Sequence, residues 1–282
     1  MRKSLRGIYI PAVTPFHEDQ TLGHDMLEFN IRKWNETRIS GYLCLGSNGE
    51  FRMLDEEESL EVIRTFAALR GKDKGLIAGA GRESLYHTHR FLDRIAQEEL
   101  DIDGVAILTP HYFRKQMDDR ALVRYYTEAA NHSRYPVLLY CAPVFANTIC
   151  VSCSALKELA DHPNIIGIKD TSPDMMEGYM ETAGGRRDFS VLSGTFSALP
   201  VCLRLGGQGG VLSAANYLPN ECEQLLTIWH QEGEEMFAKA YSELQARIQT
   251  MGGSKGVAGV KACMNALGYQ GGIPRIPLLP AD

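Results

Sequence analysis

Short apolar segments alternate with longer amphipathic segments along most of the chain. Several of the short segments are apolar on both faces. This is expected of strands that helices cover on one side and the side chains of other strands cover on the other. The eight predicted strands cover residues 7–13, 41–46, 75–81, 104–110, 136–143, 165–170, 189–194 and 209–216.

The segment 55–70 has the clearest helical pattern of the stretches between these strands. Asp55 can cap its first turn, and Glu58 follows at the spacing of a capping box. Gly71 suits the position just beyond the end of the helix. Less regular patterns predict further helices over residues 84–98, 118–132, 153–162, 174–183, 196–205 and 219–231.

This regular alternation of strands and helices implies parallel strands joined by crossover helices. Eight such units are what a closed barrel requires, so we predict an α/β fold, a (β/α)8 TIM barrel with a C-terminal helical extension. An open, doubly wound sheet satisfies the same pattern and remains the structural alternative. We expect a catalytic barrel domain over residues 1–232 and a C-terminal helical segment over residues 233–282.

The composition of the chain argues against several classes of binding partner. The 282 residues include 29 Lys and Arg against 35 Asp and Glu, for a formal net charge of -6. Such a chain lacks the basic stripe of a nucleic-acid binder, so no nucleic-acid partner is expected. Seven cysteines, an odd count, indicate reduced thiols in the cytoplasm and not a disulfide framework. No secretory signal or apolar run of membrane-span length is apparent, so no membrane partner is expected.

The strand at 165–170 ends in a lysine, Lys169, at the end where a barrel carries its active site. A lysine in an apolar run is unusual because burial of an ammonium group is costly. The simple interpretation is a strand-end lysine whose charge reaches water. The functional interpretation is a nucleophile that forms a Schiff base, whose imine serves as an electron sink. A lysine pKa near 7 requires about 4–5 kcal/mol of destabilisation of the charged form, which burial can supply.

Two other strand ends carry further polar groups. Tyr140, near the end of the fifth strand, would by default be a core aromatic with a satisfied hydroxyl. Next to Lys169 it becomes a candidate acid–base group. The loop after the second strand reads GSNGE, where two glycines around Ser47 and Asn48 let the backbone turn and present N–H groups. These groups suit a carboxylate, although Asn-Gly turns are common without any function.

The motifs GIKD (with Lys169), YCAP (with Tyr140) and GSNGE together resemble the dihydrodipicolinate synthase and N-acetylneuraminate lyase superfamily. The resemblance runs over nearly the whole chain and includes PAVTPF, GAG, TPHYF, LSG and the closing GGIPRIPL. It implies a class I aldolase or lyase that acts on a 2-oxo acid through a covalent lysine imine. It also implies a homotetramer built as a dimer of dimers. No cofactor and no metal are expected, since the imine takes the role that a metal has in a class II enzyme.

The same resemblance implies roles for individual residues. Lys169 is expected to form the imine, and Tyr140 to transfer the proton, with Ser47 in its proton relay. Tyr112 resembles the tyrosine that family members lend to the site of a neighbouring subunit. The expected substrate-binding positions are Ser47, Asn48, Gly194 and Leu212.

The choice of substrate depends on a few positions. GSNGEF, TPHYF and the spacing of Pro143, Asn147 and Thr148 resemble 4-hydroxy-2-oxoglutarate aldolases and 2-keto-3-deoxy sugar-acid aldolases. Dihydrodipicolinate synthases typically have Thr-Thr in the loop, and an arginine where this chain has Phe145. We therefore expect cleavage of a 4-hydroxy-2-oxo acid to pyruvate and an aldehyde.

Several alternatives stay open at this point. Within the superfamily they are dihydrodipicolinate synthase, sialic-acid lyase and a 2-keto-3-deoxy acid aldolase or dehydratase. Outside it, a non-catalytic barrel could bind a 2-oxo acid as a sensor. A second substrate carboxylate would need a cation, and the candidates are Arg82, His111 and Arg114.

Overall fold

The computed structural model describes residues 5–172, 174–183, 185–186 and 188–281. Within these residues, eight parallel strands close into a barrel in chain order. This confirms the predicted (β/α)8 fold and excludes the alternative, an open sheet. The strands are β1 (Gly7–Pro11), β2 (Gly41–Cys44), β3 (Gly75–Gly79), β4 (Gly104–Leu108), β5 (Val137–Cys141), β6 (Ile165–Asp170), β7 (Ser190–Ser193) and β8 (Gly209–Val211).

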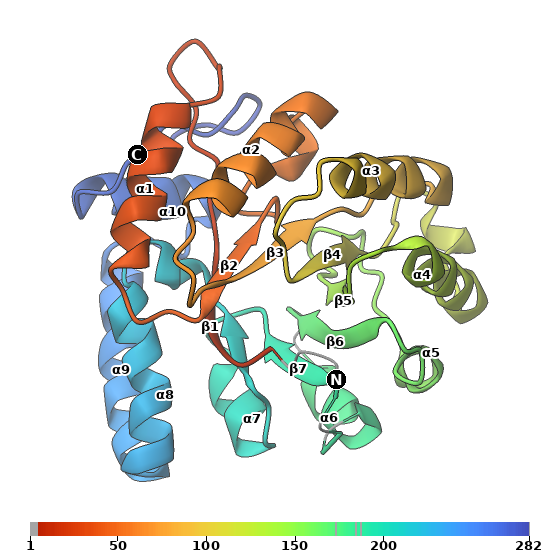
Figure 1. Ribbon diagram of the computed structural model, residues 1–282. Helices are drawn as coiled ribbons and strands as arrows, with labels where there is room; N and C mark the ends of the chain where they lie inside the picture. The colour runs from red at the N-terminus through yellow and green to blue at the C-terminus, as the bar shows by residue number, and fades with distance from the viewer. Residues whose placement is uncertain (1–4, 173, 184, 187, 282) are drawn as a thin grey trace. The chain divides into compact units, whose positions relative to one another are not determined.

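A helix follows each strand, and two more helices close the described part of the chain, as Figure 1 shows. The helices after β1 to β8 are α1 (His24–Asn35), α2 (Glu56–Leu69), α3 (Leu85–Gln97), α4 (Asp119–His132), α5 (Cys153–Leu159), α6 (Met176–Ala183), α7 (Leu199–Arg204) and α8 (Pro219–Gln231). The C-terminal pair is α9 (Glu234–Thr250) and α10 (Gly256–Ala266). Short 3-10 helices are η1 (Phe51–Met53), η2 (Arg114–Gln116) and η3 (Ser213–Asn216).

Most predicted strands are correct in position but run too long, and the last one is partly wrong. β6 has the predicted bounds, whereas β8 ends at Val211 and η3 takes the place of the predicted strand from Ser213 onward. The side-chain amide of Asn216 donates to the carbonyl oxygens of Ser213 (3.0 Å) and Pro11 (3.0 Å). These bonds favour a tight turn over continued pairing.

The N-terminus of α2 has the predicted capping box. The backbone N–H of Glu58 donates to Asp55 Oδ1 (2.8 Å), and the backbone N–H of Asp55 donates to Glu58 Oε2 (3.0 Å). Gly71 follows the C-cap residue Arg70 as predicted, but its φ is not positive. Its N–H donates instead to Asn35 Oδ1 at 2.8 Å.

The chain divides into two compact units. One comprises Met1–Arg6 and Ile77–Val211, and the other comprises Gly7–Leu76 and Leu212–Asp282. In the first unit, α3, α4, α5 and α6 pack against one another in chain order (Figure 1). In the second, α8 packs against both α9 and β1. The division of the sequence near residue 232 stays a prediction.

The structure describes every cysteine of the chain. All seven are free thiols, and five of them are buried. In the part of the chain that the structure describes, no helix is both long and apolar enough to cross a membrane.

Glu223 of α8 makes the stability of the fold depend on pH. Its Oε2 accepts a hydrogen bond from the backbone N–H of Ile8 at 3.2 Å, and burial raises its pKa from 4.5 to about 7. Between pH 4.5 and pH 7, the folded protein therefore binds more protons at Glu223 than the unfolded chain does. The stability that the protonated carboxyl group contributes is lost as the pH rises through 7.

We expect Glu223→Gln to raise the melting temperature relative to the wild type more at pH 8 than at pH 5, because glutamine stays neutral throughout. Thermal denaturation of both proteins at the two pH values measures this difference. An equal shift at both pH values would contradict the assignment.

Candidate active site

Lys169 and Tyr140 lie side by side on two neighbouring strands of the first unit. Tyr140 is the register partner of Lys169 in the pairing of β5 and β6, so the two side chains leave the sheet on the same face. Only 3% of Lys169 and 4% of Tyr140 is exposed. The Nζ atom of Lys169 lies 4.0 Å from the centre of the Tyr140 ring. The structure therefore brings together the two residues that the sequence singled out at adjacent strand ends.

Gly167 allows β6 to approach β7 closely. A Cβ at this position would lie 2.3 Å from the carbonyl oxygen of Ser190, a distance that real side chains do not adopt. The close approach keeps β6 in register with β7, where Lys169 is the partner of Leu192. All six residues of β6 are buried, so the lysine stem is held by the strand on which it stands.

The end of β6 is fixed by a turn that the sequence analysis missed. Asp170 is fully buried, and its carboxylate accepts hydrogen bonds from the backbone N–H (2.9 Å) and the hydroxyl (2.8 Å) of Ser172. Burial raises the pKa of Asp170. The Asp-x-Ser spacing at the end of a strand is typical of such a turn and could have indicated it.

The loop after β2 belongs to the second unit and carries Ser47 and Asn48. Its backbone closes on itself through hydrogen bonds from Gly49 N to Gly46 O (3.0 Å) and from Glu50 N to Ser47 O (3.1 Å). The Asn48 side-chain amide donates to Ser213 Oγ at 2.7 Å, a partner that the sequence did not suggest. The backbone N–H of Asn48 donates to no acceptor among the described residues. This N–H is therefore a free donor on the predicted carboxylate-binding loop.

The tight turn at this loop does not depend on positive φ at its glycines. Neither Gly46 nor Gly49 has a positive φ, whereas Leu45 (φ 55°) and Glu50 (φ 50°) both adopt the left-handed conformation. At Gly49, the constraint is space, because a Cβ would lie 3.0 Å from the carbonyl oxygen of Ala12. The two glycines therefore flank this turn without adopting the left-handed conformation themselves.

Gly194 and Leu212 lie at the ends of β7 and β8, one in each unit. The backbone N–H of Gly194 donates to the carbonyl oxygen of Asp170 at 2.6 Å, which ties the end of β7 to that of β6. Leu212 is fully buried, and its backbone N–H donates to Tyr9 O at 3.2 Å.

Tyr112 lies on the loop after β4 and is 76% exposed. Its ring packs edge-on against Phe113, with the ring centres 5.1 Å apart. Glu83 holds this loop, because its Oε2 accepts hydrogen bonds from the backbone N–H groups of His111 (2.9 Å) and Tyr112 (3.0 Å). The His111 ring also lies 3.1 Å from Glu83 Oε1. His111 is therefore already paired with a carboxylate.

The two candidate arginines differ in their surroundings. The Arg82 guanidinium lies 3.8 Å from the centre of the Phe91 ring. Arg114 Nε donates to Thr148 Oγ1 at 2.9 Å, which links the loop after β4 to the loop after β5. Arg114 has no carboxylate partner among the described residues. Of the three candidate cations, it is the one best suited to receive an anion.

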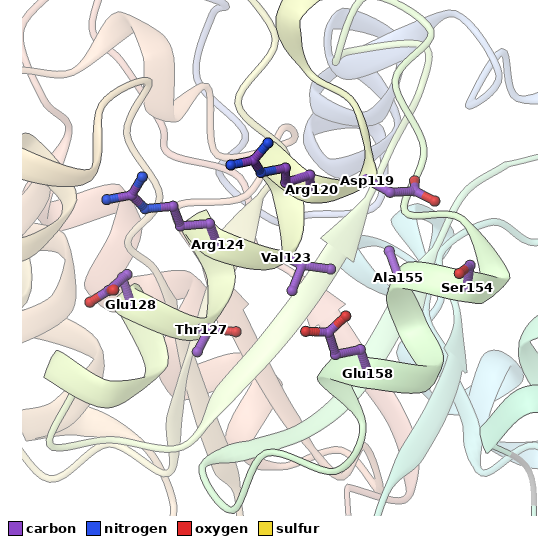
Figure 2. Close-up of a pocket in the computed structure, with 9 residues that line it drawn as sticks. All are labelled: Asp119, Arg120, Val123, Arg124, Thr127, Glu128, Ser154, Ala155 and Glu158. Carbon is purple, nitrogen blue, oxygen red and sulfur yellow. The ribbon is translucent and has the colours of Figure 1, made fainter.

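A groove of about 530 Å³ lies between α4 and α5, on the outside of the first unit, and Figure 2 shows its lining side chains. Two arginines of α4 are mixed with carboxylates of both helices along it, and none of the predicted site residues contributes to it. Its lining residues are Asp119, Arg120, Val123, Arg124, Thr127, Glu128, Ser154, Ala155 and Glu158. We therefore place the candidate chemistry at the strand ends, where barrel enzymes carry it, and not in this groove.

Metal-binding side chains do not gather within the described residues. No group of three or more His, Cys, Asp and Glu side chains there is arranged to hold a metal ion. The expectation that the reaction needs neither a metal nor another cofactor stays a prediction.

Comparison with known proteins identifies the family. Residues 4–282 match the model of the dihydrodipicolinate synthetase family. The chain belongs to this family. An uncharacterized DapA-like lyase of Pyrococcus horikoshii is 29% identical over 80% of this chain and 76% of its own length. The 4-hydroxy-tetrahydrodipicolinate synthase of Acidiphilium cryptum is 27% identical over 97% of this chain and 92% of its own length.

A solved structure supports the same relationship. It is that of YagE, a prophage protein of E. coli described as belonging to the dihydrodipicolinic acid synthase family, in complex with pyruvate. It superimposes with a TM-score of 0.88 at 25% identity, over 99% of this chain and 94% of YagE. The resemblance to the superfamily is confirmed, whereas none of these matches supports a 4-hydroxy-2-oxoglutarate aldolase in particular.

In this member of the dihydrodipicolinate synthetase family, Gly194 is required by its packing. A Cβ there would lie 2.3 Å from Thr171 Cγ2 and 2.8 Å from Asp170 O, so the end of β7 would have to move. We expect Gly194→Ala to lower the free energy of unfolding by about 1–3 kcal/mol, measured by urea denaturation. An unchanged denaturation midpoint would show that the end of β7 can move to accept the methyl group without loss of stability, and would contradict this prediction.

Proposed function

We propose that the protein is a class I aldolase that cleaves a 4-hydroxy-2-oxo acid to pyruvate and an aldehyde through a Schiff base on Lys169. The observation that carries the proposal is the buried Nζ of Lys169, 4.0 Å from the centre of the Tyr140 ring. An amine nucleophile and a phenol in register on adjacent strand ends are the two groups that imine formation and proton transfer require. Family membership and the pyruvate bound to the related YagE agree with a 2-oxo acid substrate.

In the proposed reaction, the amine of Lys169 attacks the 2-oxo carbon of the substrate. The carbonyl oxygen leaves as water with a proton from the Tyr140 hydroxyl, so that a protonated imine and the Tyr140 phenolate remain. Tyr140, as its phenolate, takes the proton of the 4-hydroxyl group. The bond between the third and fourth carbons breaks, its electron pair moves into the imine, and the aldehyde leaves. The remaining enamine takes up a proton, and water hydrolyses the imine to release pyruvate and restore Lys169.

We propose that the loop after β2 binds the carboxylate next to the 2-oxo group. The free backbone N–H of Asn48 and the hydroxyl of Ser47 are donors suited to an anion. Ser47 also serves the proton relay to Tyr140. We assign Gly194 and Leu212 to the substrate-binding surface, where small and apolar residues leave room for the carbon chain. Tyr112, in this proposal, serves the site of a neighbouring subunit in a homotetramer.

For the aldehyde half we favour glyoxylate, and hence 4-hydroxy-2-oxoglutarate as substrate. Ser-Asn replaces the Thr-Thr that dihydrodipicolinate synthases have in the loop, and Phe145 stands where they have arginine. Arg114, anchored to Thr148, is our candidate for binding the second carboxylate. The second candidate function is 4-hydroxy-tetrahydrodipicolinate synthase, because a protein of that name matches nearly the whole chain.

We expect Lys169→Ala to lower pyruvate release from 4-hydroxy-2-oxoglutarate by at least about a thousandfold without unfolding the protein, because the electron sink is lost. Tyr140→Phe should lower kcat by about 100- to 10,000-fold, because the phenolic proton acceptor is lost. A coupled lactate dehydrogenase assay measures both, with circular dichroism as the control for folding. Near-normal activity of Lys169→Ala would refute the mechanism, and a wild type that binds pyruvate without turnover would favour a sensor.

Replacement of Arg114 tests the choice of substrate. We expect Arg114→Gln to raise the KM for 4-hydroxy-2-oxoglutarate about tenfold, because a charge-assisted hydrogen bond is lost. The KM for 4-hydroxy-2-oxopentanoate, which lacks the second carboxylate, should not change. Arg120→Gln is the matched control, because Arg120 is an exposed arginine that lines the outer groove in Figure 2. Equal effects on both substrates would remove Arg114 from the site.

A further inference from the structure

The second unit contains another buried lysine, outside the proposed catalytic pair. Lys261 of α10 is 1% exposed, and its Nζ lies 2.5 Å from Glu50 Oε1. The same Nζ donates hydrogen bonds to the carbonyl oxygens of Thr14 (2.7 Å) and Ile273 (2.7 Å). Two carbonyl oxygens and one carboxylate therefore surround this ammonium group within the protein.

Glu50, its partner, is the last residue of the GSNGE loop. Its side chain is 1% exposed, and Oε1 has no hydrogen bond of normal geometry among the described residues. The positive charge of Lys261 therefore compensates the buried negative charge of this oxygen. Oε2 accepts a hydrogen bond from the backbone N–H of Arg275 at 2.8 Å. The backbone of Glu50 is left-handed, with φ 50°, which is unfavourable for a residue with a Cβ. The buried contacts therefore hold the loop in a conformation that its own backbone disfavours.

Both partners of Glu50 are anchored firmly. The Arg275 guanidinium forms two hydrogen bonds with the Glu58 carboxylate (2.7 and 2.8 Å) and donates to Gln20 O (2.7 Å). The hydroxyl of Thr14, whose carbonyl oxygen binds Lys261, donates to Gly49 O at 2.8 Å. The loop is thus held at two successive residues by groups from distant parts of the same unit.

The burial of these charges argues against a role in stability alone. Burial lowers the pKa of Lys261 to about 8 even though Glu50 favours its charged form. A buried ion pair often stabilises a fold no more than apolar residues of similar volume would, and its better-attested benefit is a unique local structure.

We propose that Lys261 and Glu50 are positioning residues, whose buried ion pair holds the loop 46–50 so that Ser47 and Asn48 are aligned for the carboxylate of the 2-oxo acid. This inference rests on the proposed function, because it assumes that the loop binds this carboxylate. It assigns a role in substrate binding to the C-terminal helix α10, which the sequence analysis treated as an appended segment. Loss of the ion pair should weaken binding of the 2-oxo acid and leave the chemistry at Lys169 intact.

The test is borohydride trapping of the imine in the full-length protein over a range of pyruvate concentrations, with the adduct quantified by mass spectrometry. The variants are Glu50→Gln, Lys261→Met and the double variant Glu50→Gln/Lys261→Met. Lys74→Met is the matched control, because Lys74 is also buried and ion-paired, to Asp73, but precedes β3 at the opposite end of the barrel. Melting temperatures are recorded for all proteins.

We expect the half-saturating pyruvate concentration to rise at least tenfold in both single variants, with the same maximal adduct as the wild type. In the double variant, which buries no unpaired charge, the melting temperature should recover while the half-saturating concentration stays high. Lys74→Met should lose stability without any change in the half-saturating concentration. If Lys261→Met does not fold, the other two variants carry the test. Glu50→Gln leaves the ammonium group of Lys261 with polar partners, and the double variant removes this group.

Two results would overturn the inference. One is a half-saturating concentration in Glu50→Gln equal to that of the wild type. The other is a double variant in which pyruvate binding recovers together with the melting temperature, which would make the pair purely structural. Absence of any adduct in the wild type would instead refute the proposed function, so the two failures are distinguishable.

Discussion

The register between β5 and β6 is the constraint on which the candidate site depends. It makes Tyr140 the partner of Lys169, so an amine and a phenol leave the sheet together in a buried environment. A shift of either strand by one residue would send one of the two side chains to the opposite face. On its other side, β6 packs closely against β7 at Gly167 and Ser190 and at Gly194 and Asp170. The strand that carries Lys169 thus depends on its pairing with β5 and on a close approach to β7 that only glycine permits.

Two of the buried lysines, Lys169 and Lys261, show how surroundings give the same side chain different roles. Lys261 is held by a carboxylate and two carbonyl oxygens, so its amine is fully engaged and serves as a fixed point. Lys169 has the face of an aromatic ring beside its amine and no carboxylate partner among the described residues. An engaged ammonium group suits the positioning of a loop, whereas a nucleophile must have its lone pair free to attack.

The sequence was sufficient for the barrel, because the apolar strands and amphipathic helices follow local rules, and β6 and the capping box of α2 have the predicted residues. It failed where distant groups decide local structure. The bonds of Asn216 end β8 early, and Glu50 takes its left-handed conformation in contacts with Lys261 and Arg275. No short-range pattern links residues so far apart in the chain. A lysine within the apolar stretch of α10 was the one available signal.

The most direct test of the central claim is borohydride reduction of the wild-type protein in the presence of pyruvate, followed by peptide mass spectrometry. If Lys169 forms the imine, the peptide that contains it, and no other, should gain about 72 Da, the mass that a reduced pyruvate imine adds. An adduct on a different lysine, or none at saturating pyruvate, would contradict it.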